Sequence, residues 1–189
     1  MTQDEVLGLF RQSGALLEGH FRLSSGLHSG GYLQCALVLQ HPAHAAALGA
    51  ALGARTRDRG ATAVLSPALG GVVIGHEVGR ALNVRAVFAE RQEGVLTLRR
   101  GFTLGSDDRV LVVEDVLTTG GSTRETIAVA RAAGATVVGA AAIIDRGSEP
   151  ARLDVPLASL AHHPLPTFDP AACPLCAKGL PIVKPGSRT

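Results

Sequence analysis

Residues 109–123 constrain the fold of this chain more than any other segment. They begin with an apolar, β-branched run at 110–113, which is typical of a strand buried on both faces. Two carboxylates and a turn rich in Thr, Gly and Ser follow. Ser122 and Glu125 then have the Ser-x-x-Glu spacing of a helix capping box, and an apolar helical stripe continues to Gly134, a typical helix stop. The segment therefore predicts a buried strand, a polar loop and a helix in succession.

The polar loop has the composition of a phosphate-binding site. Gly120 and Gly121 let the backbone approach an anion, while free N–H groups and the helix dipole point toward it. Glu114 and Asp115 would repel a phosphate in direct contact, so we expect them to face ribose hydroxyls or a hydrated metal ion. A glycine-rich surface turn is the alternative interpretation, but it leaves the coincidence of acids, hydroxyls and glycines unexplained. The loop therefore predicts a sugar-phosphate site, with further donors from the hydroxyls of Thr118, Thr119, Ser122 and Thr123.

Strands and helices alternate along the chain, which predicts an α/β fold with a mainly parallel sheet. In such a sheet, ligands bind at the carboxyl ends of the strands. We therefore expect the loops at 67–71, 114–123 and 145–147 to meet at one site. The predicted helices are at 2–13, 43–57 and 72–82, the further strands at 61–66, 84–89 and 136–144, and a β-hairpin at 92–102.

The run Val112-Val113-Glu114-Asp115-Val116-Leu117-Thr118-Thr119-Gly120-Gly121-Ser122 resembles the phosphoribosyl pyrophosphate (PRPP) signature of type I phosphoribosyltransferases. The flanking segments are most similar to orotate phosphoribosyltransferases, in a short form with Cys-Pro-Leu-Cys near the C-terminus. This resemblance implies the type I phosphoribosyltransferase fold, with a small N-terminal hood. It implies transfer of the 5-phosphoribosyl group from PRPP to orotate, giving orotidine 5′-monophosphate and pyrophosphate in pyrimidine biosynthesis. It also implies Mg²⁺ as a cofactor and a homodimer.

The same resemblance assigns roles to individual residues. In the family, the acidic pair holds the ribose hydroxyls and the following loop holds the 5′-phosphate. The predicted catalytic residues are Asp115 and Arg100, and no protein ligands for a metal are predicted. The predicted orotate-binding residues are Thr118, Arg146 and Tyr32. The predicted PRPP-binding residues are Glu114, Asp115, Val116, Leu117, Thr118, Thr119, Gly120, Gly121, Ser122, Arg91, Gly70 and Gly71.

The sequence departs from the family pattern at basic positions. Ser24 stands where many relatives carry a lysine, and Gln92 replaces a lysine of the family's mobile loop. Arg99 and Arg100 are candidates to replace this charge, with a solvated hairpin face as the alternative. Tyr32 can stack on a planar base or fill a gap in the hood, and the sequence favours neither.

Length and composition bound the remaining possibilities. The 189 residues fit a single domain (1–189), with the hood at 14–39 and a Pro-rich, irregular segment at 148–189. A formal charge of +2 without a basic run argues against a nucleic-acid partner. The acidic N-terminus does not resemble a signal peptide, and the most apolar stretch, 135–144, is too short to cross a membrane. We therefore expect a cytoplasmic protein without a membrane partner.

Three cysteines argue against a disulfide framework. Cys173 and Cys176 have the spacing of a metal knuckle, but a structural zinc site needs about four ligands. His162, His163 and Cys35 are the further ligands considered, and none forms a second pair at knuckle spacing. The sequence therefore favours two reduced thiols.

Two alternative functions stay open. The first is a phosphoribosyltransferase for a purine or uracil, against which Arg146 argues because such bases carry no carboxylate. The second is a non-catalytic regulator that senses PRPP, which would need a nucleic-acid-binding module that the sequence does not show.

Overall fold

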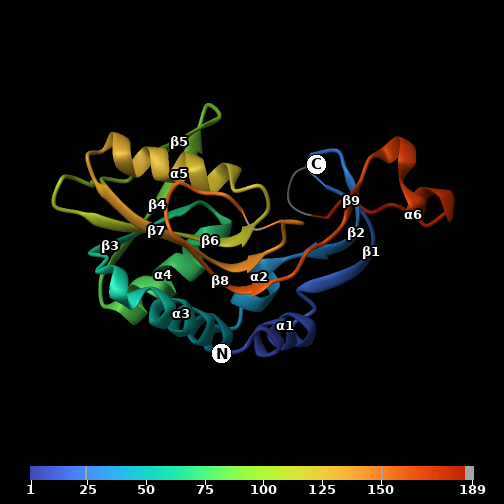
Figure 1. Cartoon of the computed structure of the whole chain (residues 1–189), viewed down its shortest axis with the longest axis horizontal. Helices are drawn as coiled ribbons and strands as arrows, with labels where there is room; N and C mark the ends of the chain where they lie inside the picture. The colour runs from blue at the N-terminus through green and yellow to red at the C-terminus, as the bar shows by residue number, and fades with distance from the viewer. Residues whose placement is uncertain (24, 150, 186–189) are drawn as a thin grey trace.

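A computed structural model describes residues 1–23, 25–149 and 151–185 (Figure 1). Its centre is a six-stranded sheet in the order β5-β4-β3-β6-β7-β8, in which only β5 is antiparallel to its neighbour. The prediction of a mainly parallel α/β sheet is therefore confirmed. The strands are β3 (Ala63–Pro67), β4 (Arg85–Gln92), β5 (Val95–Leu98), β6 (Arg109–Leu117), β7 (Thr136–Asp145) and β8 (Leu157–His162).

Helices cover both faces of this sheet. On one face, α3 and α4 pack against side chains of β3 and β6 such as Val64 and Leu111, with α1 and α2 beside them. On the other face, α5 packs over Leu65 and Val112. Figure 1 shows α5 above the sheet and α3 and α4 below it. The helices are α1 (Gln3–Gln12), α2 (Cys35–Leu39), α3 (Pro42–Thr56), α4 (Gly70–Leu82), α5 (Gly121–Ala132) and the short α6 (Pro174–Ala177), with 3-10 turns η1 (Arg57–Arg59) and η2 (Pro170–Ala172).

The central strand β6 is buried on both faces, as its apolar run predicts. Val110, Leu111, Val112 and Val113 have no exposed surface. Successive side chains of a strand point to opposite faces, so this run contributes to both apolar cores. β6 continues to Leu117, so the two acidic residues lie within the strand and not after it.

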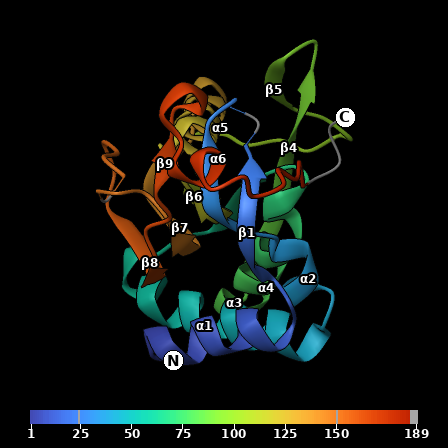
Figure 2. The same ribbon diagram turned by 90° about the vertical axis from the view of Figure 1, so that its right-hand side faces the viewer.

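The hood is a separate, three-stranded antiparallel sheet with the order β1-β2-β9. β1 (Leu16–Arg22) and β2 (His28–Leu33) form the predicted N-terminal hairpin, and the third strand, β9 (Thr167–Phe168), comes from the C-terminal part of the chain. Figure 2 shows the hood in front of the sheet, with the β4–β5 hairpin projecting beside it. Ser24 lies outside the described residues.

The C-terminal segment corrects the sequence prediction of an irregular tail. Residues 157–162 form β8, which extends the parallel sheet beyond β7 and buries Leu160 and Ala161. This strand is short and follows a Pro-rich stretch, so its sequence gives little sign of the pairing. Among the described residues, no helix combines the length and apolar character that crossing a bilayer requires.

Candidate active site

Three loops at the carboxyl ends of β3, β6 and β7 meet at one edge of the sheet, as predicted. The backbone connects the last two directly, since Arg146 N–H donates to the Leu117 carbonyl at 2.9 Å. The β3–α4 loop approaches the acidic pair of β6 from the other side. Two cavities lie along this edge, one on each side of the β6–α5 loop.

Glu114 is a largely buried carboxyl. Its Oε2 accepts a hydrogen bond from the Thr123 hydroxyl on the first turn of α5. Burial raises the pKa of Glu114 to about 7, the Thr123 hydrogen bond opposes this rise, and the neighbouring Asp115 adds to it. Near neutral pH this carboxyl therefore changes readily between a hydrogen-bond donor and a pure acceptor.

Asp115 is held close to the β3–α4 loop. Its Oδ1 accepts the N–H of Val116 at 2.8 Å, and burial raises its pKa above the ordinary range. A Cβ atom at Gly70 would lie 2.7 Å from Asp115 Oδ2, and one at Gly71 would lie 3.0 Å from the Val113 carbonyl oxygen. Glycine is therefore required at both positions for the loop to approach the acidic strand this closely.

The first cavity, of about 190 Å³, lies between this loop and the acidic pair. Polar groups dominate its wall, including both carboxylates, Ser122 and Arg91. Arg91 reaches it from the end of β4 and pairs with Glu125 of α5 at 2.8 Å. The cavity therefore combines anionic acceptors, a hydroxyl and one cation, which suits a polyhydroxylated ligand that carries a charged group.

The capping box predicted at Ser122 and Glu125 is wrong. The N-cap of α5 is Gly120, with φ of 76°, and no side chain among the described residues caps the helix. Glu125 pairs with Arg91 instead, and Thr123 donates to Glu114. Within the described chain, the first N–H groups of α5 therefore have no side-chain partners beside the first cavity, which is the arrangement that binds phosphate at a helix N-terminus.

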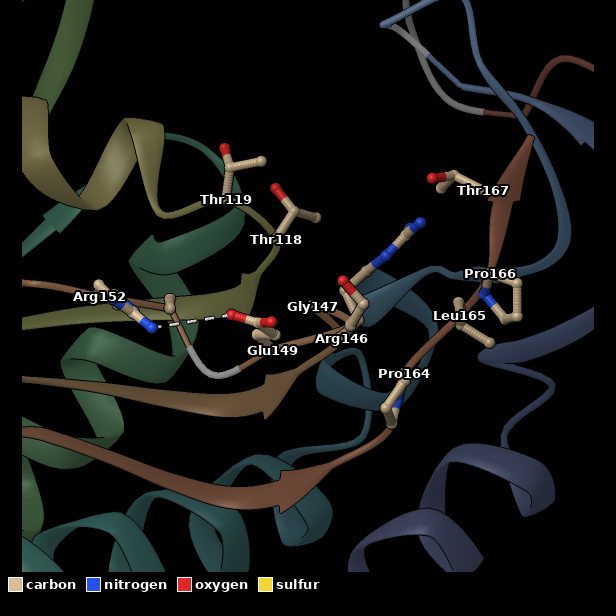
Figure 3. Close-up of a pocket in the computed structure, with 12 residues that line it drawn as sticks. Thr118, Thr119, Arg146, Gly147, Glu149, Arg152, Pro164, Leu165, Pro166 and Thr167 are labelled. Carbon is tan, nitrogen blue, oxygen red and sulfur yellow. Dashed lines mark ion pairs between the residues drawn. The ribbon is translucent and has the colours of Figure 1, made fainter. Parts of the chain in front are cut away.

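The second cavity, of about 620 Å³, lies between the β6–α5 loop and the hood-side segment 164–167 (Figure 3). Thr118 and Thr119 form one wall, and Leu165, Pro166 and Thr167 form the other. The guanidinium of Arg146 extends into the space between them.

Arg146 is a mostly buried cation. The residue is 9% exposed, and burial lowers its pKa, while the nearby Tyr32 opposes this. Within the described residues, no carboxylate pairs with its guanidinium. Arg152 on the same cavity, by contrast, has a side chain that is 93% exposed and forms an ion pair with Glu149 at 4.0 Å. A buried, unpaired guanidinium at a cavity wall is a site for a ligand carboxylate.

The structure places the other predicted residues at varied distances from the two cavities. Tyr32 lies near Arg146 and Asp115, which have opposing effects on its pKa, and burial raises that pKa overall. Arg100 lies on the hairpin, where it donates to both Glu90 carboxylate oxygens at 2.7 and 2.8 Å. It lines neither cavity. Val116 and Leu117 contribute backbone to the strand and not side chains to the cavity walls.

Sequence reasoning missed the hood-side wall of the second cavity. Leu165, Pro166 and Thr167 come from the Pro-rich segment, and they reach the site because Thr167 pairs with Ser29 of β2. The Ser29 hydroxyl also donates to the Pro166 carbonyl at 2.9 Å. β9 has only two residues and pairs with a strand far away in the sequence, so no pattern in its own sequence predicts it.

Comparison with known proteins agrees with this geometry. The Phosphoribosyl transferase domain family matches residues 36–158. Over its whole length the chain is 54% identical to the orotate phosphoribosyltransferase of Acidithiobacillus ferrooxidans and 50% identical to that of Pelotomaculum thermopropionicum, covering 98% and 99% of those proteins. The crystal structure of orotate phosphoribosyltransferase from Aeropyrum pernix is similar with a TM-score of 0.70 and 28% identity, covering 83% of this chain and 93% of that one. The chain therefore belongs to the orotate phosphoribosyltransferases, within the type I phosphoribosyltransferase family.

Proposed function

We propose that this protein transfers the 5-phosphoribosyl group of PRPP to orotate, giving orotidine 5′-monophosphate and pyrophosphate in pyrimidine biosynthesis. The observation that carries the choice of base is the unpaired guanidinium of Arg146 at the second cavity. Orotate is a planar base with a carboxylate, which this guanidinium can bind through two parallel hydrogen bonds. Adenine, hypoxanthine and uracil would leave the buried cation without a partner, at a cost in affinity.

The two cavities divide the substrates between them in this proposal. Thr118, Thr119 and the N-terminal amides of α5 hold the 5′-phosphate at the junction of the cavities. Glu114 and Asp115 accept hydrogen bonds from the ribose hydroxyls. The diphosphate lies toward Gly70, Gly71 and Arg91 in the first cavity. The anomeric carbon then faces the second cavity, where Arg146 positions the base.

The chain's contribution to the reaction is alignment and charge placement. The base nitrogen attacks the anomeric carbon as pyrophosphate leaves, and holding both substrates in register can lower the barrier by roughly 7–11 kcal/mol. Asp115 is placed to stabilise positive charge that develops on the ribose, because its carboxylate is fixed by the Val116 amide. Tyr32 contributes beside the base in this proposal, and Arg100 contributes from the β4–β5 hairpin.

Magnesium is compatible with these residues. The first cavity presents the carboxylate oxygens of Glu114 and Asp115 and the hydroxyl of Ser122, which are hard oxygen donors of the kind that hydrated Mg²⁺ contacts. When bound with PRPP, the ion would offset the charge of the leaving diphosphate. The residues of the chain bind and orient the sugar in either case.

The quaternary state and location follow from the family resemblance. We propose a cytoplasmic homodimer, in which the exposed β4–β5 hairpin, with Arg99 and Arg100 at its base, approaches the diphosphate site of a second subunit.

A direct assay tests the proposed function. The protein is incubated with Mg²⁺ and PRPP, and orotate, uracil, adenine and hypoxanthine are offered separately. We expect nucleotide and pyrophosphate with orotate alone. Turnover of another base instead of orotate would refute the assignment of the base. Absence of turnover with every base, together with tight PRPP binding, would favour the non-catalytic regulator.

A further inference from the structure

Two histidines of the hood and two cysteines of the C-terminal segment converge on one point. His20 lies on β1, His28 on the neighbouring β2, and Cys173 and Cys176 flank the start of α6. One potential ligand atom from each of the four residues lies within 4.8 Å of all the others. His20, His28 and Cys173 are buried, and Cys176 is exposed. We refer to these four residues as the hood cluster.

The distances within the hood cluster match a tetrahedral metal site. His20 Nε2 lies 3.1 Å from His28 Nδ1, 3.6 Å from Cys173 Sγ and 3.7 Å from Cys176 Sγ. Cys176 Sγ lies 3.3 Å from His28 Nδ1. Zinc bonds of about 2.0–2.1 Å to nitrogen and about 2.3 Å to sulfur would place two nitrogens about 3.3 Å apart, and a nitrogen and a sulfur about 3.6 Å apart. These four separations are therefore close to those that one ion would impose, and the ligand atoms of all four residues lie within 4.8 Å of one another.

The orientation of His20 provides a second, independent indication. Its Nδ1 lies 2.9 Å from the Leu180 carbonyl oxygen, which can only accept a hydrogen bond. Nδ1 therefore carries the proton, and the lone pair is on Nε2, which faces the cluster. A ligating histidine is typically fixed in this way, with its second nitrogen donating to a carbonyl or carboxylate.

Few apolar side chains stabilise the contact between the hood sheet and the C-terminal segment. The buried positions of β1 and β2 include three polar residues, His20, His28 and Ser29, and Phe21 and Leu33 are their large apolar ones. The C-terminal segment joins this sheet through the two residue pairs of β9 with β2 and through backbone hydrogen bonds between Val183 and β1. A small sheet with a polar interior has little hydrophobic stabilisation, so a metal ion that links its strands adds a large share of its stability.

We propose that His20, His28, Cys173 and Cys176 form a structural zinc site that fastens the C-terminal segment to the hood. Thiolate and imidazole ligands in a tetrahedral set favour zinc, and four protein ligands leave no position open for catalysis. The site is distinct from the magnesium proposed with PRPP, since it contains no oxygen ligand.

Zinc in the hood cluster also supports the wall of the second cavity. His28 pairs with Phe168 of β9, and Ser29 pairs with Thr167, which lines that cavity. Loss of the ion would release this wall and weaken the positioning of the base. This consequence rests on the proposed function, whereas metal content does not, so the two can fail separately.

Metal analysis of the untagged protein tests the proposal. The chain is purified without chelator from medium containing zinc, and its metals are measured by mass spectrometry. We expect about one zinc atom per chain, and cobalt substituted for it should give the visible absorption of a tetrahedral thiolate site. Removal of zinc with a chelator should lower the Tm by roughly 5 °C or more, and added zinc should restore it.

Variants assign the ion to its ligands. Cys176→Ser and His28→Asn should each lose most of the zinc. Cys35→Ala and His162→Asn, which remove a cysteine and a histidine outside the hood cluster, should retain it. Wild-type protein without zinc that also takes up none when it is offered would overturn the proposal. A Cys173–Cys176 disulfide detected by mass, or undiminished zinc in both ligand variants, would overturn it as well. If the ligand variants do not fold, metal content and chelation of the wild type decide the question.

Discussion

In the proposed function, Arg146 connects the fold to the choice of acceptor base. It follows β7 directly, so its position is set by a strand that is buried along most of its length. Its guanidinium is mostly withdrawn from water without a carboxylate partner in the described chain, which leaves a cation whose desolvation cost is offset only when an anion binds. The same residue would therefore disfavour bases that lack a carboxylate.

Replacement of Arg146 by alanine should selectively impair the use of orotate. Charge-assisted hydrogen bonds contribute about 1.5–3 kcal/mol, so we expect kcat/KM for orotate to fall by roughly ten- to 150-fold while the KM for PRPP changes little. Steady-state kinetics with each substrate varied in turn measures this. Arg152→Ala removes an exposed arginine from the same cavity and should have little effect. Equal losses toward both substrates would contradict the assignment.

The raised pKa of Glu114 leads us to expect that the protein becomes less stable as the pH rises toward neutrality. Its pKa in the folded chain is about 7, above the ordinary value of 4.5, so the folded state binds the proton more tightly than the unfolded state. Stability is therefore full below about pH 4.5 and is lost as the pH rises toward 7. The corresponding free energy is at most on the order of 3 kcal/mol.

The variant Glu114→Gln should remove this dependence. It keeps an oxygen that can accept the Thr123 hydroxyl, but it has no charge to desolvate. At pH 8 we expect the variant to be more stable than the wild type against urea, with the difference shrinking at pH 5, while its KM for PRPP rises. A difference in unfolding free energy that is the same at both pH values would show that burial of the charge is not the cause.

Sequence reasoning was most successful where the order of strands and loops fixes a residue's position. Gly70 and Asp115 were predicted to lie at one site, and in the structure a Cβ atom added at Gly70 would lie 2.7 Å from Asp115 Oδ2. His20 and His28 were overlooked as possible partners of Cys173 and Cys176, since the hairpin that aligns them and the fold that delivers the cysteines are both long-range features. His162, which was considered instead, lies on β8 at the edge of the sheet.

At the scale of elements, Leu96 of β5 packs in one apolar cluster with Ile127 of α5, whereas a weak ion pair joins Arg91, near the end of β4, to α5. Arg91 and Glu125 form an ion pair with side chains 37% and 47% exposed, and such pairs contribute at most about 1 kcal/mol. Arg91 can therefore leave Glu125 for a more highly charged ligand at little cost.

Replacement of Arg91 by alanine should weaken PRPP binding without destabilising the protein. We expect the KM for PRPP to rise by roughly tenfold and the Tm to change little. Glu125→Gln breaks the same ion pair but keeps the cation, so its KM for PRPP should not rise. If both variants raise the KM equally, then the ion pair positions the hairpin and Arg91 does not contact the diphosphate.

The elements that the sequence predicted well are those with strong periodicity. The buried run of β6 and the helices predicted at 2–13, 43–57 and 72–82 all appear in the structure, with ends that differ by a few residues. The capping box predicted for α5 failed because the helix begins at Gly121, which places Ser122 inside it, and because Glu125 pairs with Arg91. β8 and β9 were missed because each is short and is defined by its pairing with a distant strand.

At the scale of the whole molecule, a large sheet with an apolar core and a small sheet with a polar interior share one chain. An apolar core runs from Ala15 and Leu33 at the base of the hood to Leu111 and Val113 in the central strand. This continuity supports our proposal that residues 1–189 form a single domain. The part of β1 and β2 that lies farther from the central sheet than Leu33 contributes few large apolar side chains to this core.

Hydrogen exchange should therefore separate the hood from the central sheet. In protein stripped of zinc, we expect amides of β1, β2 and β9 to exchange well before those of β6 and β7, because opening the hood exposes little apolar surface. Mass spectrometry of peptic fragments measures the order, and zinc should slow exchange in the hood alone. Simultaneous exchange of both sheets would mean that the hood opens only when the whole protein unfolds.

The interleaving of the two ends of the described chain has a consequence for biosynthesis. β1 and β2 leave the ribosome long before β9 and Val183, which complete the hood. In the proposed function, a nascent chain therefore has the loop for the sugar phosphate before it has residues 164–167, which line the cavity proposed for the acceptor base. Both parts of the proposed site exist only once β9 has been synthesised.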